Sequence, residues 1–312
     1  MSETKRVLLV GIANMDLSLN VYKAPDAGES VTDDGGVAYT PGGSAVGAAV
    51  AFARLGADVH LAAKLGADLH GQKLYSYFKE IGISTAEIKV DHTYPTGFSV
   101  IIKEGDGRRR TINYPGTNHH LTTENILSAF SCEPEALYLS LDLPQESLMI
   151  SLRIAQGKGI PIFLNASPMR EDISPESLPR LEVFTLNESE AEALVGILPT
   201  GMDSALKAAL AIRRRVDARY IIIKMGARGA FVYDGKHYDV VPPYKPDCVV
   251  DTQGAGDAFD AALTVEYLRS GDMQRAVRFG AAAGAIAVSR EGVTSAMPTE
   301  EELYEFLRRQ LD

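Results

Sequence analysis

Residues 249–259 read VVDTQGAGDAF, an apolar strand end followed by a glycine-rich turn and then by the start of a helix, which we expect from about Ala258 to Arg269. Backbone N–H groups at the N-terminus of a helix attract anions, and glycine lets a ligand approach them closely. The stretch therefore predicts a strand, turn and helix that together bind a phosphate group.

Asp257 lies where a simple anion site would not have a carboxylate, because its charge would repel the phosphate. It is useful if a substrate hydroxyl group lies between it and a γ-phosphoryl group, since it can then orient the hydroxyl and accept its proton. The turn amides would stabilise the charge on the transferred group. The alternative is that Asp257 only caps its helix, which aspartate often does. Two other phosphate motifs are excluded, because GxxxxGK[ST] is absent and Phe259 occupies the third glycine position of GxGxxG.

The rest of the chain alternates between buried strands and helices. Apolar runs predict strands at 7–10, 136–139, 160–164, 183–186 and 220–223. Helical periodicity predicts helices at 44–55, 71–81, 147–156 and 202–215, and Gly56, Gly82 and Gly157 are expected to end the first three. This order predicts an α/β fold in which helices flank a central, mostly parallel sheet. We expect one domain over residues 1–312.

Two stretches, 21–41 and 96–114, interrupt this alternation and predict a small β lid beside the active site. In the second, Phe98–Ile102 should pair with Thr111–Tyr114 as a hairpin, although an ordinary surface hairpin is the alternative. The arginines at 108–110 are expected to be a solvated hairpin tip or, alternatively, to touch an anionic substrate under the closed lid.

The composition excludes several classes of protein. Among 312 residues, 31 Lys and Arg face 41 Asp and Glu, and this net charge of -10 argues against binding to nucleic acid or to an anionic membrane surface. The apolar run from Val7 to Ala13 is too short for a signal core or a membrane span, which needs about 20 residues. Cys132 and Cys248 form no CxxC motif, so neither a disulfide framework nor a thiolate zinc site is supported. We expect a soluble, cytoplasmic protein.

The chain resembles the ribokinase-like (PfkB) family of carbohydrate and nucleoside kinases from Val7 to about Leu311. The family's DTxGAGD signature matches residues 251–257 letter for letter, and its N-terminal glycine signature matches PGGS at 41–44 followed by an alanine-rich helix. The resemblance implies a ribokinase-like fold and phosphoryl transfer from ATP with Mg²⁺. It also implies that Asp257 is the catalytic base and that the amides of Gly254, Ala255 and Gly256 form the anion hole.

The resemblance also suggests how the sugar binds. Asn14 and Asp16 belong to a first-strand motif that reaches sugar hydroxyl groups, and a carboxylate can accept two vicinal hydroxyls. The alternative is a solvated turn at a strand end. Gly42 and Gly43 would let the backbone approach the sugar, or would form a plain turn. Asp142 occupies the place of a sugar-contacting acid, although an aspartate at a strand end can also be a cap.

On the nucleotide side, Asn187 and Glu190 resemble the family's NxxE element, which organises Mg²⁺ and the phosphates through water. The same spacing also describes a helix-capping box. A nucleotide-side loop is expected at Lys224, Gly226, Arg228 and Gly229. The alternative for this loop is a two-glycine hairpin with Arg228 exposed.

A monovalent cation such as K⁺ often binds in this family between the strand end at Asp251 and a late loop, here about 287–296. Most of its ligands would be backbone carbonyl groups, so Asp251 is the only side chain that the resemblance assigns to the cation. Glu190 is assigned to Mg²⁺ through water.

Three positions depart from the family pattern. Gly47 replaces an asparagine that usually binds substrate hydroxyls, and Ser44 replaces a lysine typical of ribokinases. A late asparagine beside the nucleotide falls in the alanines at 281–283. The departures at Gly47 and Ser44 leave phosphoryl transfer intact and weaken the case for ribose itself, whereas the alanines suggest altered recognition of the adenine.

The expected function is ATP-dependent phosphorylation of a hydroxyl group on a small monosaccharide, ribose or a related sugar, by a homodimer. Two alternatives remain open at this stage. One is a nucleoside kinase that uses the same residues, and the other is a sugar-sensing protein with weak catalysis.

Overall fold

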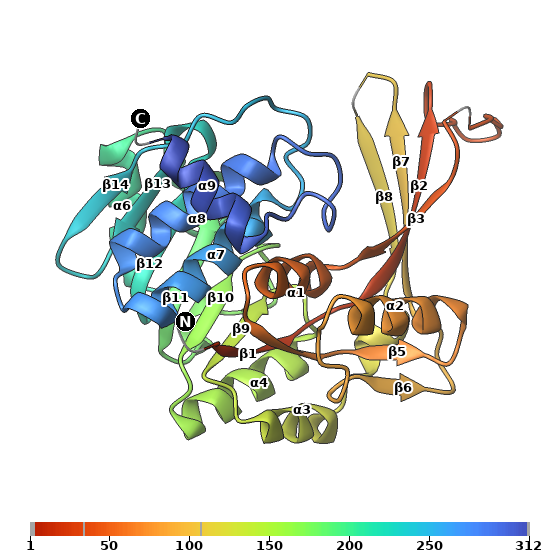
Figure 1. Cartoon of the computed structure of the whole chain (residues 1–312), viewed down its shortest axis with the longest axis horizontal. Coiled ribbons are helices and arrows are strands. Elements are labelled where there is room, and N and C mark those ends of the chain that lie inside the picture. The colour runs from red at the N-terminus through yellow and green to blue at the C-terminus, as the bar shows by residue number, and fades with distance from the viewer. Residues whose placement is uncertain (1–3, 34, 107, 311–312) are drawn as a thin grey trace.

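The computed structural model describes residues 4–33, 35–106 and 108–310. The main body of the fold contains a sheet of eight strands (Figure 1). Their order across the sheet is β14 (Tyr238–Val241), β13 (Ala230–Tyr233), β12 (Ala218–Lys224), β11 (Leu181–Asn187), β10 (Ile162–Asn165), β9 (Ala136–Ser140), β1 (Arg6–Val10) and β4 (Asp58–Ala62). The strands from β4 to β12 are parallel, and β13 and β14 add an antiparallel edge. The predicted, mostly parallel sheet is confirmed.

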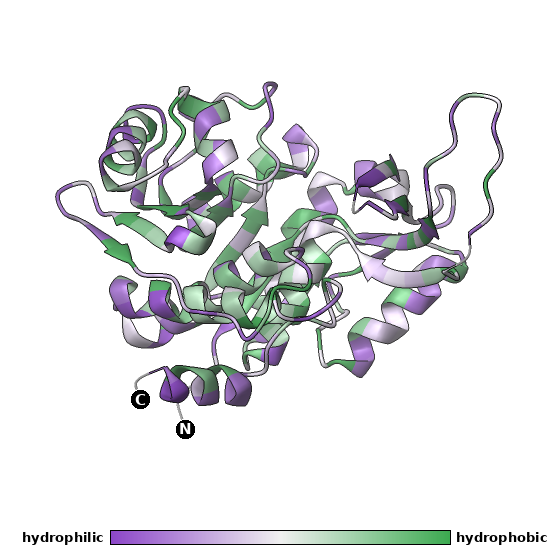
Figure 2. Cartoon of the chain, turned by 90° about the horizontal axis from the view of Figure 1, so that it is seen from above, coloured by the Kyte–Doolittle hydropathy of each residue, from purple (hydrophilic) through white to green (hydrophobic). Residues whose placement is uncertain are grey.

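Helices cover both faces of this sheet. One face packs against α1 (Ser44–Arg54), α7 (Ala255–Ser270), α8 (Met273–Ala287) and α9 (Glu300–Arg309). The other packs against α3 (Thr123–Ala129), α4 (Gln145–Lys158), α5 (Glu188–Val195) and α6 (Met202–Arg213). In β1, Val7 and Leu9 point to the first face and Leu8 and Val10 to the second, so the strand is apolar throughout. Hydrophobic residues gather in the middle of the main body and hydrophilic residues toward its periphery (Figure 2).

The glycine predicted to end each helix is confirmed for two helices and wrong for the third. Gly56 and Gly82 follow α1 and α2 (Leu69–Glu80) with positive φ angles of 80° and 79°. Gly157 instead lies inside α4, and the C-cap is Gly159, whose φ is 68° and whose N–H group bonds to the carbonyl groups of the last turn. A left-handed C-cap ends the helix, and Gly159 rather than Gly157 adopts that conformation.

A second, four-stranded sheet projects beside the main body, with the order β3 (Ala38–Gly42), β2 (Asn14–Val21), β7 (Gly97–Glu104) and β8 (Arg109–Tyr114) (Figure 1). The predicted hairpin is present, with Phe98 opposite Tyr114 and Val100 opposite Ile112. The sheet also includes β2, which lies ahead of the expected segment 21–41. Its sequence NMDLSLNV lacks a long apolar run because much of the strand is only half-buried.

Smaller features complete the fold. Strands β5 (Lys64–Gly66) and β6 (Lys89–Asp91) pair in parallel, and β5 contacts α2. At the end of the projecting hairpin, Arg108 and Arg110 are exposed, as expected of a solvated tip, and each also forms an ion pair with the buried Glu104. No helix within the three described ranges is both long enough and apolar enough to cross a membrane.

Candidate active site

The turn before α7 leaves backbone donors free at the start of that helix. Gly254 is the N-cap with a φ of 74°, a left-handed conformation that favours glycine. The N–H group of Ala258 bonds to the Gly254 carbonyl at 2.9 Å. The N–H groups of Ala255, Gly256 and Asp257 precede this first helical bond, and among the described residues no side chain caps them. The helix therefore presents three donors and a positive dipole end to whatever lies in front of it.

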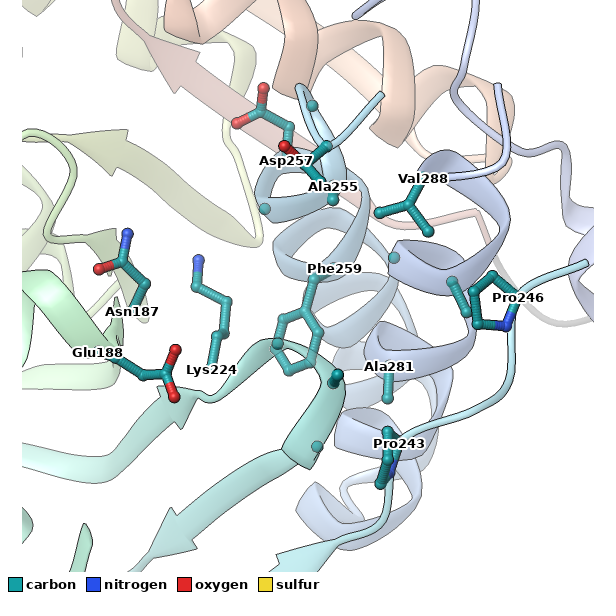
Figure 3. A pocket seen from close by; sticks show the side chains of 18 of the residues that line it. Asn187, Glu188, Lys224, Pro243, Pro246, Ala255, Asp257, Phe259, Ala281 and Val288 are labelled. Atoms are coloured by element: carbon teal, nitrogen blue, oxygen red, sulfur yellow. The ribbon is translucent and has the colours of Figure 1, made fainter. Parts of the chain in front are cut away.

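These donors face a cavity of about 1100 Å³ between the ends of β11 and β12, the loop after β14, and helices α7 and α8. Asp257 lies at one end of the cavity, Lys224 and Asn187 on a second wall, and Pro243, Pro246 and Ala281 farther along (Figure 3). The volume slightly exceeds the range of about 300–1,000 Å³ that is typical of small-molecule sites. The cavity combines a polar end at Asp257 with apolar walls.

Most residues predicted for the nucleotide side line this cavity. They are Asn187, Glu190, Lys224, Gly226 and Gly229, together with the Gly254–Asp257 turn. Arg228 lies outside this lining, because its guanidinium group is half exposed and pairs with Glu188. The segment around it is a hairpin loop between β12 and β13, as in the alternative interpretation of the sequence.

A buried ion pair lies behind the catalytic candidate. Lys224 Nζ is 3.0 Å and 3.1 Å from the two carboxylate oxygens of Asp260. The hydroxyl groups of Tyr138 and Thr185 donate to Asp260 Oδ2 at 3.2 Å and 3.1 Å. Asp260 is 1% exposed and lies three residues after Asp257 on α7. The sequence analysis missed Asp260, although an acid inside an apolar helix beside the expected base was a signal for it.

Burial dominates the electrostatics of Asp257. Removal from solvent raises the pKa of its carboxyl group, the charge of Asp260 raises it further, and the Lys224 ammonium group opposes the rise, which leaves a pKa of about 7. Asp142 makes a smaller contribution in the raising direction. The carboxylate form is thus present near neutral pH and takes up a proton readily.

Gly47 of α1 lies against the Asp257 carboxylate. A Cβ atom on residue 47 would be 2.5 Å from Asp257 Oδ2 and 2.9 Å from Val293 Cγ1. The space into which an asparagine side chain would extend from this backbone is therefore occupied by the carboxylate itself. The absence of a side chain at residue 47, where the family pattern has asparagine, therefore leaves room for the Asp257 carboxylate.

On the side of the small sheet, Asp16 lies directly over Gly42. The two residues are on paired strands, and a Cβ atom on Gly42 would be 2.1 Å from Asp16 Oδ2. Asp16 Oδ1 is buried without a hydrogen-bond partner among the described residues. Burial raises the pKa of Asp16, and a hydrogen bond from Ser99 opposes this. Gly43 has a φ of 95°, and a Cβ atom there would be 2.5 Å from the Ile12 carbonyl oxygen, which requires glycine.

Asn14 and Asp142 already have protein partners. Asn14 Oδ1 accepts a hydrogen bond from Asn118 at 2.7 Å, and its Nδ2 donates to Ser99 at 3.3 Å. Asp142 accepts from Ser140 at 3.0 Å and from Ser44, the second residue at which the chain departs from the family pattern. Burial raises the pKa of Asp142, and these two hydroxyl groups oppose the rise.

Asn187 and Glu190 form the capping box that was the alternative to a functional role. Asn187 Oδ1 accepts from the Glu190 N–H group at 2.9 Å, and Glu190 Oε2 accepts from the Asn187 N–H group at 2.7 Å. Both residues also line the cavity. Their part in binding Mg²⁺ stays a prediction.

Asp251 connects two loops near the base of α7. Its Oδ1 accepts from the Gln253 N–H group at 3.0 Å and its Oδ2 from the Gly292 N–H group at 3.3 Å. The Val288 carbonyl accepts from the N–H groups of Val250 and Asp251. The structure therefore brings Asp251 to the late loop expected for a monovalent cation.

Comparisons with known proteins agree with this geometry. A model of the pfkB family of carbohydrate kinases matches residues 4–300. The chain is 30% identical over 308 residues to the ribokinase of Haemophilus influenzae, which covers 97% of this chain and 98% of that protein. It is also 30% identical over 308 residues to the ribokinase of Bacillus subtilis, covering 97% and 99%. The structure of Arabidopsis thaliana ribokinase complexed with ribose and ATP has the same fold, with a TM-score of 0.88, 21% identity, and 98% and 99% of the two chains covered.

Proposed function

Because this chain belongs to the pfkB family of carbohydrate kinases, we propose that it transfers the γ-phosphoryl group of ATP to a hydroxyl group of ribose or a related monosaccharide, with Asp257 as the base. The proposal depends above all on one observation. The Asp257 carboxylate lies beside the free N–H groups of the first turn of α7, at the end of a cavity of about 1100 Å³. Phosphoryl transfer to an alcohol needs this combination of a proton acceptor and fixed donors for the transferred group.

The cavity supports binding of the nucleotide along its length. Its apolar part, with Pro243, Pro246 and Ala281, offers a surface for a flat base. The phosphates would then extend toward the start of α7, where the helix dipole and the N–H groups attract negative charge. Lys224 and Gly226 line the wall along this path.

Asp257 orients the acceptor hydroxyl group and takes its proton as the new P–O bond forms. A base works best when its pKa lies near the working pH, and a pKa of about 7 meets that condition. The Lys224–Asp260 ion pair holds opposing charges behind the carboxylate. Neither partner needs to contact the sugar in order to influence the proton affinity of Asp257.

Asp16 is the best-supported sugar contact. Its buried Oδ1 has no partner among the described residues, and an unpaired buried oxygen is costly unless a ligand supplies a donor. Gly42 has no side chain, and the Asp16 carboxylate occupies the space that a Cβ atom there would fill. The proposed contact surface for the sugar also includes Asn14, Gly43 and Asp142. The side chains of Asn14 and Asp142 would bind the sugar through lone pairs or donors that their protein partners do not use.

Glu190 and Asn187 fit a role in holding Mg²⁺ through water, because the cavity wall there carries oxygen donors, which this cation prefers. Bound Mg²⁺ would neutralise charge on the phosphate oxygens. Asp251 fits a K⁺ site in the same sense, since it joins the two loops whose carbonyl groups would complete the shell. Lys224, Gly226, Arg228 and Gly229 stay assigned to the nucleotide side.

The small sheet supports a dimer with a lid from each subunit at the interface. Val37, Tyr39, Ile112 and Tyr114 on its strands and connecting segment are between 48% and 66% exposed, which is unusual for such large apolar side chains. We therefore infer a homodimer, for which light scattering of wild type and Ile112→Asp is the test. The use of ATP and the presence of two free cysteines also fit a cytoplasmic location.

The function is tested with a panel of pentoses, hexoses and nucleosides in an ATP-consumption assay, with and without K⁺. Turnover with a pentose supports the proposal, and K⁺ activation supports the Asp251 site. Turnover with nucleosides alone would identify a nucleoside kinase. Sugar binding without ATP consumption for every compound would point to a sensor. Asp257→Asn should lower turnover by about 10²–10⁴-fold while calorimetry still detects sugar binding.

A further inference from the structure

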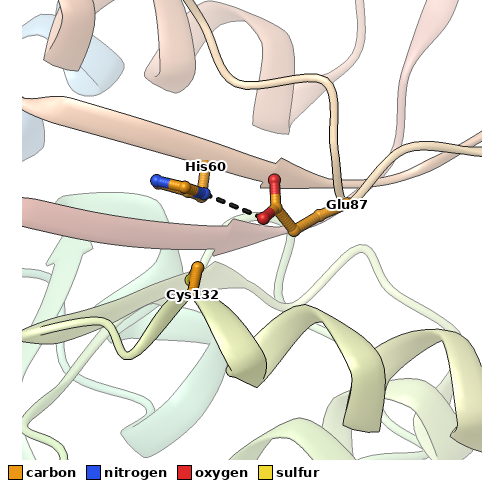
Figure 4. A group of neighbouring side chains, drawn as sticks. All are labelled: His60, Glu87 and Cys132. Atoms are coloured by element: carbon orange, nitrogen blue, oxygen red, sulfur yellow. Dashed lines mark hydrogen bonds and ion pairs between the residues drawn. The ribbon is translucent and has the colours of Figure 1, made fainter.

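Three potential metal ligands from distant parts of the chain meet outside the active-site cavity. They are His60 on β4, Glu87 in the segment between α2 and β6, and Cys132 at the end of the short helix η2 (Phe130–Cys132). His60 Nδ1 is 2.9 Å from Glu87 Oε1, and the ligand atoms of all three lie within 4.8 Å of one another. Figure 4 shows Cys132, at the end of η2, below the neighbouring side chains of His60 and Glu87.

From this arrangement we propose that His60, Glu87 and Cys132 bind a divalent transition-metal ion, with Zn²⁺ as the best match. Cysteine spacing did not predict this site, because only one ligand is a thiol and the chain folds the other two beside it. An imidazole nitrogen and a thiolate prefer Zn²⁺ over Mg²⁺ or Ca²⁺, and three protein ligands leave a fourth position for water.

Neighbouring side chains orient two of the ligands. Asp58 Oδ1 lies 3.4 Å from His60 Nε2, and Ser84 Oγ donates to Glu87 Oε2 at 2.9 Å. Histidine ligands of metals commonly donate their second N–H group to a carboxylate, and carboxylate ligands are commonly hydrogen-bonded in turn. An N–H group at Nε2, on the side of Asp58, would leave Nδ1, the atom facing Glu87, as the ligand.

Charge also favours a divalent cation. A thiolate and a carboxylate together carry two negative charges, which one divalent ion neutralises, and Glu87 is only 7% exposed. Binding replaces the thiol proton, which is released to solvent, with a metal–sulfur bond.

The distances require only a small rearrangement. Metal–ligand bonds of about 2.0–2.3 Å in a tetrahedral site place ligand atoms roughly 3.3–3.8 Å apart. A pair separated by 4.8 Å would have to shorten by about 1 Å, whereas the 2.9 Å between His60 Nδ1 and Glu87 Oε1 would have to lengthen by about 0.4 Å, and side-chain rotations can supply both changes. None of the three residues lines the active-site cavity, so the site is separate from phosphoryl transfer. The ion would tie the edge strand β4 to η2 and stabilise that side of the sheet.

The test is a titration of the metal-free full-length protein with Co²⁺, whose thiolate complexes absorb in the near ultraviolet. One equivalent should produce this band, and Zn²⁺ should remove it. The band should be lost in Cys132→Ser and retained in Cys248→Ser, which removes the other free thiol. Ser84→Ala should weaken binding by about tenfold. Co²⁺ bound at an oxygen-lined Mg²⁺ site gives no thiolate band and cannot produce a false positive.

Thermal unfolding provides a second readout. Zn²⁺ should raise the midpoint by several degrees in wild type and Cys248→Ser, and by much less in Cys132→Ser or His60→Gln. Kinase activity should be unchanged in Cys132→Ser. A wild-type protein without a thiolate band, or a band that survives Cys132→Ser, would overturn the proposal and leave His60 and Glu87 as a structural hydrogen bond only.

Discussion

Asp257→Asn should make the protein more stable while it removes catalysis, and the gain should depend on pH. The ordinary pKa of an aspartate is about 3.9, so a folded-state value of about 7 corresponds to about three units, each worth 1.36 kcal/mol. Holding this carboxylate ionised in the folded protein therefore costs up to about 4 kcal/mol at pH 8. Asparagine has nearly the same shape and carries no charge, so the variant avoids this cost.

The direction follows from proton binding. Between about pH 3.9 and 7 the folded state holds a proton at Asp257 that the unfolded state has lost, so this group makes wild type less stable as pH rises through that range. The advantage of Asp257→Asn should therefore be up to about 4 kcal/mol at pH 8 and about 1.5 kcal/mol at pH 5. For a chain of 312 residues, 1 kcal/mol shifts the melting midpoint by about 1.5 °C.

The assay is thermal unfolding of wild type and variant at pH 5 and pH 8 without ligands. We expect a rise of up to about 6 °C at pH 8 and about 2 °C at pH 5. Asp217→Asn is the matched control, because Asp217 is exposed at the surface, and it should change the midpoint by little at either pH. An Asp257→Asn protein that is less stable than wild type at pH 8, or equally shifted at both values, would refute the buried carboxylate.

Three further predictions concern the neighbours of Asp257. Asp260→Asn removes a negative charge that raises the pKa of Asp257 and leaves Lys224 to lower it, so the acidic limb of kcat/KM should move about one unit below its wild-type position near pH 7. Lys224→Met should move the limb upward in the same pH–rate measurement, and a shift of both variants in one direction would contradict the electrostatic explanation. Gly47→Ala places a Cβ atom 2.5 Å from the Asp257 carboxylate and should lower kcat by at least about tenfold, which corresponds to about 1.4 kcal/mol in the activation barrier. The control is Gly157→Ala, where the new Cβ atom has no neighbour within 4 Å, and it should leave kcat unchanged.

The main sheet was predictable because its parallel strands are buried on both faces. Strands β1, β9 and β12 contain uninterrupted apolar runs in the sequence, and in β11 a single threonine interrupts such a run. Strand β2 gives no such signal, since much of it is only half-buried and it alternates apolar with polar residues. Burial therefore decides which strands a single sequence reveals.

The motif at 251–257 predicted the turn, the helix and the acid, because these features are local in sequence. The environment of that acid is not local. Lys224, Tyr138 and Thr185 come from three different strands and meet Asp260 only after the sheet has formed. The cluster of His60, Glu87 and Cys132 was missed for the same reason. Residue spacing cannot reveal contacts between segments that topology alone brings together.

The departure from the family pattern at Gly47 has a different meaning in the sequence and in the folded chain. From the sequence, its lack of an amide group suggested one missing sugar contact and weakened the case for ribose as the substrate. In the structure, the space beside Gly47 holds the Asp257 carboxylate, and the missing side chain allows α1 and α7 to approach closely there. Gly47→Asn should therefore displace the base rather than restore a sugar contact. Its effect should appear in kcat and in the acidic limb of the pH profile before it appears in sugar affinity, and improved sugar affinity with unchanged kcat would contradict this view.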